Sequence, residues 1–239
     1  MLSDLTVGTT TLSGANTYTG TTAVNSGQLT LSGGAAIADT SAVTVASGAT
    51  LSVGTDETVA SLVSGGTISG AGKLTAATYG FTGGTITSNL GAGTLTQTSG
   101  STALNGTADA TTVNINGGTL TLGAADRLAD GAAVTVAGGT LAMGAFSDTV
   151  ASVTMTSGAI TGTSGVLTST AAFAMQGGTA SAILGGTAGL TATVGTTTLS
   201  GANTYTGTTA VNSGQLTLSG GAAIADTSEI GRASCRERG

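Results

Sequence analysis

The sequence predicts an all-β fold, a parallel β-helix (β-solenoid) of about twelve coils with about 19 residues in each. Three observations predict it: a long segment that occurs twice, glycines that recur at a steady interval, and short runs in which apolar and hydroxyl-bearing residues alternate. One such coil cannot bury its apolar face alone, whereas stacked coils share a continuous core.

The first observation is the internal repeat. Residues 193–228 repeat residues 6–41 without a single change, at an offset of 187. Weaker matches occur at an offset of 91, where the segment Thr58–Ser61 returns as Thr149–Ser152. The chain therefore reads as a little over two blocks of roughly 91–96 residues. A flexible linker, the other interpretation of so much Gly, Ser and Thr, has no reason to keep such intervals.

The second observation is the spacing of the glycines that precede each apolar or Thr-rich run. Their mean interval is 18.7 residues, because 11 intervals cover the 206 residues from the first to the last. The glycines are Gly8, Gly27, Gly48, Gly66, Gly84, Gly100, Gly118, Gly139, Gly158, Gly178, Gly195 and Gly214. We interpret them as markers of successive coils.

The third observation is a two-residue periodicity within each coil. Apolar and hydroxyl or amide residues alternate in Leu29–Leu31, Leu51–Val53, Val113–Ile115 and Val134–Val136. This pattern is typical of strands with one buried and one solvent-facing side. Inward residues should form columns along the axis, and twelve coils at the ordinary strand spacing would give a rod roughly 55 Å long. The absence of proline suits strands that pair on both sides.

Composition excludes several functions. The 239 residues include 42 Gly and 51 Thr but no His, so Ser-His or Cys-His nucleophile pairs and His-rich zinc sites are excluded. Five basic and 11 acidic residues provide no surface for nucleic acid. The longest apolar runs are a few residues long, so we predict no transmembrane segment, and we predict no cofactor.

The last eleven residues differ abruptly from the rest. Five of these eleven are charged, whereas the 228 residues before them carry eleven charges in total, and the tail holds the single cysteine, Cys235. The stretch EIGRASCRERG resembles translated sequencing adapter. We therefore predict one solenoid domain over residues 1–228 and interpret residues 229–239 as a non-native, adapter-derived tail. The alternative is a genuine divergent terminus.

Residues 12–31, LSGANTYTGTTAVNSGQLTL, closely resemble the autotransporter-associated β-strand repeat, whose hallmark is SGxNTYTGxTxVxxGxLxL. The motif returns at residues 199–218, and residues 124–136 look like the coil that separates such motifs. The resemblance implies a right-handed parallel β-helix, exported to the surface of a Gram-negative or related bacterium. It implies a role as adhesin, stalk or display scaffold. Met1–Asp4 is no signal peptide and no barrel strands follow, so we expect an internal segment of a longer exported protein.

The motif residues have a structural interpretation and a functional one. We expect the asparagines to satisfy turn backbone groups and the tyrosines to cover the edge of the core, although an exposed tyrosine at a binding tip is the alternative. The motif positions are Asn16, Tyr18, Gly20, Gly27, Leu29, Leu31, Asn203, Tyr205, Gly207, Gly214, Leu216 and Leu218.

Carboxylates are the remaining candidates for chemistry. Asp56, Glu57, Asp126 and Asp130 are expected in solvated turns, and they are also the weak candidates for ligand-binding loops; Asp126 and Asp130 lie in one of the two longest glycine intervals. The Gly-Gly-x-Gly-x-Asp repeat of calcium-binding β-rolls is absent, so we predict no metal site. The only basic residues before the tail, one Lys and one Arg, lie in different coils and nothing in the sequence pairs them.

Three functions follow as hypotheses. The first is a non-enzymatic adhesin shaft or structural spacer, and the second is a module that binds a carbohydrate or a host or environmental surface through turns that depart from the period. The third is a lyase or hydrolase, which needs ionisable groups gathered in one groove. Interrupted outward Thr ladders make ice binding a remote alternative. Coils without a cap at either end should also let the chain associate end to end.

Overall fold

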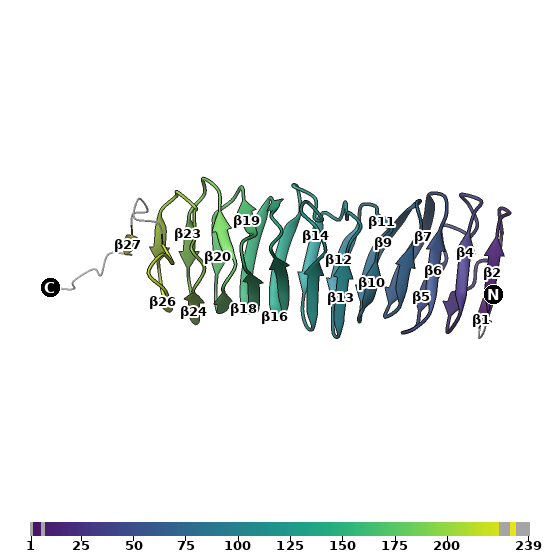
Figure 1. The fold of residues 1–239 in the computed structure, drawn as a ribbon, viewed down its shortest axis with the longest axis horizontal. Helices are drawn as coiled ribbons and strands as arrows, with labels where there is room; N and C mark the ends of the chain where they lie inside the picture. Colours follow the sequence, from purple (N-terminus) through teal and green to yellow (C-terminus); the bar gives the residue numbers. More distant parts are fainter. Residues whose placement is uncertain (1, 6–7, 225–229, 233–239) are drawn as a thin grey trace.

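The computed structural model describes residues 2–5, 8–224 and 230–232, and it confirms the predicted all-β parallel solenoid. In Figure 1 the coils stack along the long axis, from β2 near one end to β26 near the other. The described chain makes about 11 turns of ~19 residues, close to the number expected from the glycines, and it contains no helix.

Each coil contributes a strand to a first parallel ladder. This ladder contains β1 (Leu2–Leu5), β3 (Thr22–Val24), β5 (Ala42–Val45), β7 (Glu57–Ser64), β9 (Lys73–Phe81), β12 (Thr94–Gln97), β14 (Thr112–Ile115), β16 (Ala133–Gly144), β18 (Ser152–Gly162), β20 (Phe173–Met175), β23 (Leu190–Ala192), β25 (Thr209–Val211) and β27 (Ile230–Arg232). Every named pairing is parallel, so each interior strand uses its backbone groups on both sides.

A second ladder follows around the corner of each coil. It contains β2 (Thr9–Leu12), β4 (Gln28–Leu31), β6 (Thr50–Val53), β8 (Thr67–Ser69), β10 (Gly84–Ile86), β13 (Ser101–Leu104), β15 (Thr119–Leu122), β21 (Gly178–Ala180), β24 (Thr196–Leu199) and β26 (Gln215–Leu218). The long strands β16 and β18 turn the corner without a break and supply both ladders at their coils.

A third side is formed by shorter strands. It contains β11 (Asn89–Leu90), β17 (Asp148–Val150), β19 (Val166–Ser169) and β22 (Ile183–Gly185), together with the first residues of β7 and β9. Isolated bridges join Leu90 to Ala108 and Ala108 to Leu128, so the column continues between β11 and β17. This side carries most of the polar contacts between coils.

The predicted alternation places apolar residues inside. In the first ladder Val43, Leu62, Tyr79, Leu95 and Val113 follow one another in register, and all are buried. The residues between them face outward. Fully burying such an apolar side chain stabilises the fold by about 1.5–3 kcal/mol, and each inward residue contacts the coils above and below. The core is therefore one continuous column rather than a globular cluster.

Motif glycines allow close approach between coils. Gly27 has a φ of 71° and Gly214 a φ of 77°, in the left-handed region that favours glycine. A Cβ on Gly27 would overlap the carbonyl oxygen of Gly8, and a Cβ on Gly207 would overlap the backbone nitrogen of Gly189. Glycine at these motif positions therefore has a steric cause.

The two copies of the repeated motif differ in what covers them. Leu29 and Leu31 are fully buried because β6 stacks on β4. Leu216 is partly buried and Leu218 is 45% exposed, because no described strand pairs with the outer edge of β26. Identical sequence thus has different burial, decided by whether another coil follows.

The segment interpreted as a tail contributes a strand. Ile230–Arg232 form β27, which pairs in parallel with β25 in the register Thr209 to Ile230. Strand pairing therefore continues past the boundary expected at residue 228. Residues 233–239, which include Cys235, lie outside the described part of the chain.

Candidate functional site

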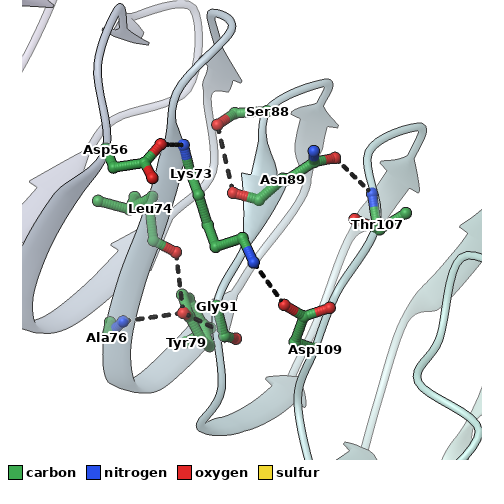
Figure 2. A network of polar contacts seen from close by, with 10 residues as sticks. All are labelled: Asp56, Lys73, Leu74, Ala76, Tyr79, Ser88, Asn89, Gly91, Thr107 and Asp109. Atoms are coloured by element: carbon green, nitrogen blue, oxygen red, sulfur yellow. Dashed lines mark hydrogen bonds and ion pairs between the residues drawn. The ribbon is translucent and has the colours of Figure 1, made fainter.

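Polar side chains gather on the third side of the solenoid, near β9 and β11 (Figure 2). Asp56 Oδ1 accepts a hydrogen bond of 2.8 Å from the backbone N–H of Lys73, and Lys73 Nζ donates one of 2.7 Å to Asp109 Oδ2. Asn89 Oδ1 accepts another, of 3.0 Å, from the N–H of Thr107. Each contact joins different coils, so the group links three consecutive coil steps.

Lys73 forms an ion pair with Asp109, a contact that the sequence did not predict. The two side chains are 43% and 50% exposed, and they are separated by 36 residues, which places the pair across the intervening coil at β11. The hydrogen bond and the charge of Asp109 raise the pKa of Lys73 above its usual value. Because water surrounds both groups, the pair contributes little to stability.

Tyr79 anchors the inner side of this corner. Its hydroxyl accepts a hydrogen bond from the N–H of Ala76 at 2.8 Å and lies 3.0 Å from the carbonyl oxygen of Leu74 and 3.1 Å from that of Gly91. Burial raises the pKa of the Tyr79 phenol. The phenol therefore acts as a neutral structural group that satisfies backbone atoms at a bend within β9.

Glu57 is the main correction to the predicted ligand loops. It is 2% exposed, and its two carboxylate oxygens accept hydrogen bonds from the N–H groups of Ala36 and Ile37 at 3.0 and 2.8 Å. It pairs in register with Leu74, so it occupies a position in an inward column. The strand alternation of β7 directs it to the core, where it holds the loop of the preceding coil.

Asp148 repeats this arrangement 91 residues later. Its Oδ2 atom accepts hydrogen bonds from the N–H groups of Arg127 and Leu128 at 2.8 and 3.0 Å, while its buried Oδ1 atom has no partner within the described residues. Burial is the largest cause that raises its pKa, to about 6, and the charge of Asp126 adds to the effect. The offset of 91 from Glu57 was the signal in the sequence that could have identified this residue.

The other predicted loop residues lie at the surface. Asp56, Asp126 and Asp130 are exposed, as expected for turns. Asp126 has a φ of 55°, in the left-handed region that Asp tolerates better than most residues. The Arg127 guanidinium donates to the carbonyl oxygens of Ala125 and Asn105, so its charge is directed at backbone and not at these carboxylates.

The motif asparagines bridge coils, as the structural interpretation expects. Asn203 Oδ1 accepts from the N–H of Leu184 at 2.8 Å, and its Nδ2 donates to the carbonyl oxygen of Ala223 at 2.7 Å. Asn16 Nδ2 donates to the carbonyl oxygen of Ala36 at 2.8 Å. The Asn203 amide therefore bonds to the backbone of neighbouring coils, as the buried carboxyl groups of Glu57 and Asp148 do.

The motif tyrosines face the core. Tyr205 is fully buried and its hydroxyl lies 2.8 Å from Thr209 Oγ1; burial raises its pKa. Tyr18 makes the same contact with Thr22 at 2.8 Å and is partly buried against the core. The geometry offers no exposed tyrosine tip at either position.

The surface of the described residues is hollowed at two places of note. One, of about 410 Å³, lies at the corner between the first two ladders, and the other, of about 310 Å³, lies at the last coils. Neither lining includes Asp56, Lys73 or Asp109, so this surface group of ionisable side chains lies outside both. The described residues contain no group of three metal-ligating side chains, and no helix among them has the length and hydrophobicity to cross a membrane.

The fold and the polar staples between coils define a repeat protein of the β-solenoid class. The family model of the passenger-associated-transport-repeat matches residues 7–31 and 194–218, which confirms the predicted resemblance at both copies of the motif. The chain is thus similar to an autotransporter passenger repeat family at two places, and its solenoid fits a segment of such a passenger. No curated protein and no solved structure matches the chain.

Proposed function

We propose that this chain is a non-enzymatic shaft or spacer within an exported bacterial surface protein. The observation that supports this most strongly is the unbroken first ladder from β1 to β25, which makes one rod of stacked coils. The 11 steps between these 12 strands, at the ordinary strand spacing, give roughly 50 Å of reach. The passenger repeats support export to the cell surface.

Side-chain chemistry supports the same role. The buried polar groups Glu57, Asp148 and Asn203 bond to backbone of neighbouring coils. The Tyr79 hydroxyl bonds to backbone of its own corner and, at Gly91, of the next coil. These groups are used in fixing coil to coil and are not directed at a cleft. A rod whose coils are stapled in this way transmits position and force along its axis.

The test is a surface-display experiment. The chain is inserted between an outer-membrane anchor and an adhesive tip of known ligand, and adhesion of the cells is measured. A matched control carries a scrambled sequence of the same length and composition, which keeps the Gly and Thr content but loses the period. We expect cells that display the tip on the solenoid to adhere better than cells that display it on the scrambled linker. Equal adhesion with both would contradict the spacer function, and adhesion without the tip would assign binding to the chain itself.

A further inference from the structure

The shortest coils of the solenoid produce a groove. The corner between β5 and β6 contains the four residues 46–49, whereas the corners between β7 and β8 and between β9 and β10 contain only two residues each, 65–66 and 82–83. The two short corners are recessed beside the longer one. The cavity of about 410 Å³ lies here, within the range of small-molecule sites.

The lining of the groove is neutral and rich in hydrogen-bonding groups. Exposed hydroxyls come from Thr44, Ser47 and Thr82, and Asn25 also borders the groove. Thr82 Oγ1 lies 3.3 Å from the carbonyl oxygen of Ser64, which leaves its lone pairs available as acceptors. None of the described lining residues is charged, so the groove offers nothing that would neutralise an ionic ligand.

The groove also has one apolar surface. Val63 is 48% exposed, one of the few large apolar side chains that face solvent, and it follows Thr44 in the outward column. The next position in that column is Gly80, whose missing side chain leaves the flank of Val63 uncovered. The hydroxyls and the apolar flank therefore lie side by side along the axis.

The length of the groove and its direction along the solenoid axis indicate which class of ligand it fits. The lining residues come from four consecutive coils, so the groove runs along the axis for three coil steps, roughly 14 Å. An extended peptide would need free backbone groups to pair with, but β5 and β7 already pair on both sides. A neutral polyhydroxylated chain needs only side-chain hydroxyls and an apolar surface for its C–H faces.

We propose that this groove, centred on Thr44, Val63 and Thr82, binds a short neutral oligosaccharide. The site goes beyond the spacer function, because it adds a ligand-binding site to the lateral surface of the solenoid. It also differs from the acidic turns expected to bind: concavity arises where coils are shorter than the period, and not where they are longer. The ligand lies along the axis and takes hydrogen bonds from successive coils.

The test titrates neutral trisaccharides of β-1,4-linked glucose, xylose and N-acetylglucosamine into the full chain, with trigalacturonic acid as the charged comparison, and follows binding by NMR. The double variant Thr44→Val, Thr82→Val removes two hydroxyls at nearly constant shape. The matched control, Thr135→Val with Thr154→Val, also replaces two threonines by valine, in the outward-facing column that contains Thr44 but beyond the groove.

We expect at least one neutral trisaccharide to bind, about tenfold more weakly to the groove variant, since each lost hydrogen bond weakens binding severalfold. The control variant should bind like the unmodified chain. No binding of any neutral trisaccharide, equal binding by both variants, or stronger binding of the acidic trisaccharide would overturn the proposal. The display experiment on spacing does not depend on these outcomes, so the two proposals fail separately.

Discussion

Replacing Asp148 by Asn should remove a pH-dependent loss of stability. The Asp148 carboxyl has a pKa of about 6 in the folded chain, above its ordinary value of 3.8, because burial disfavours its charge. A carboxyl that holds its proton more tightly when folded stabilises the fold fully below pH 3.8, and this contribution is lost as the pH rises through about 6. A shift of about two pKa units corresponds to about 3 kcal/mol.

The amide that D148N introduces carries no charge, and its oxygen can still accept the hydrogen bonds from the N–H groups of Arg127 and Leu128. Its nitrogen would take the place of Oδ1, which has no partner among the described residues, and that cost is the same at every pH. The difference in the free energy of unfolding between D148N and the unmodified chain should therefore change by about 2.5 kcal/mol, in favour of D148N, between pH 4 and pH 7.5.

Urea unfolding of both chains over this pH range measures the difference. Glu57→Gln is the matched control, because Glu57 occupies the equivalent position but uses both oxygens. In E57Q the new amide nitrogen would face a backbone N–H, whose hydrogen bond it cannot accept. We therefore expect E57Q to be destabilised by about 1–3 kcal/mol at neutral pH. If the difference between D148N and the unmodified chain stays constant from pH 4 to pH 7.5, the reasoning from burial is wrong.

Three further outcomes are expected. Leu95→Ala, at a fully buried position, should lower the free energy of unfolding by about 2–5 kcal/mol, and the outward-facing Thr96→Ala in the same strand should change it far less; similar urea curves for the two would contradict the assignment of the core face. Gly27→Ala should destabilise by more than about 1 kcal/mol, because φ is 71° and a Cβ would overlap Gly8, and a Tm equal to that of the unmodified chain would count against this. The chain should self-associate with concentration through its last coil, and Leu218→Lys should reduce the apparent mass in light scattering; a monomer at all concentrations would refute the contact.

The sequence alone predicted the solenoid because its signals are local. Gly27 and Gly214 mark coils, and the alternation around Leu29 and Leu31 assigns inward and outward faces from neighbouring residues only. The structural interpretation of the asparagines and tyrosines also depends on the motif itself. None of these inferences requires knowledge of which coil positions meet in space.

The candidate site could be predicted only in part, because contacts between coils depend on register. Asp56 was placed correctly in an exposed turn, but its neighbour Glu57 points into the core, since a single residue step in a strand reverses the face. The pairing of Lys73 with Asp109 joins residues two coils apart, and no local pattern predicts it.

The sequence by itself thus determined the class of fold, the coil period and the poverty of reactive side chains. Only the tertiary structure decided which carboxylates are buried, where Lys73 finds its partner and where the short coils recess to form the groove at Val63. The physical reason is register: coils of different lengths stack with their strands aligned, so that Val43, Leu62 and Tyr79 share one column although their spacings are unequal. Which side chains meet between coils therefore depends on where each coil takes up its extra or missing residues, while the alternation within one strand depends only on its own residues.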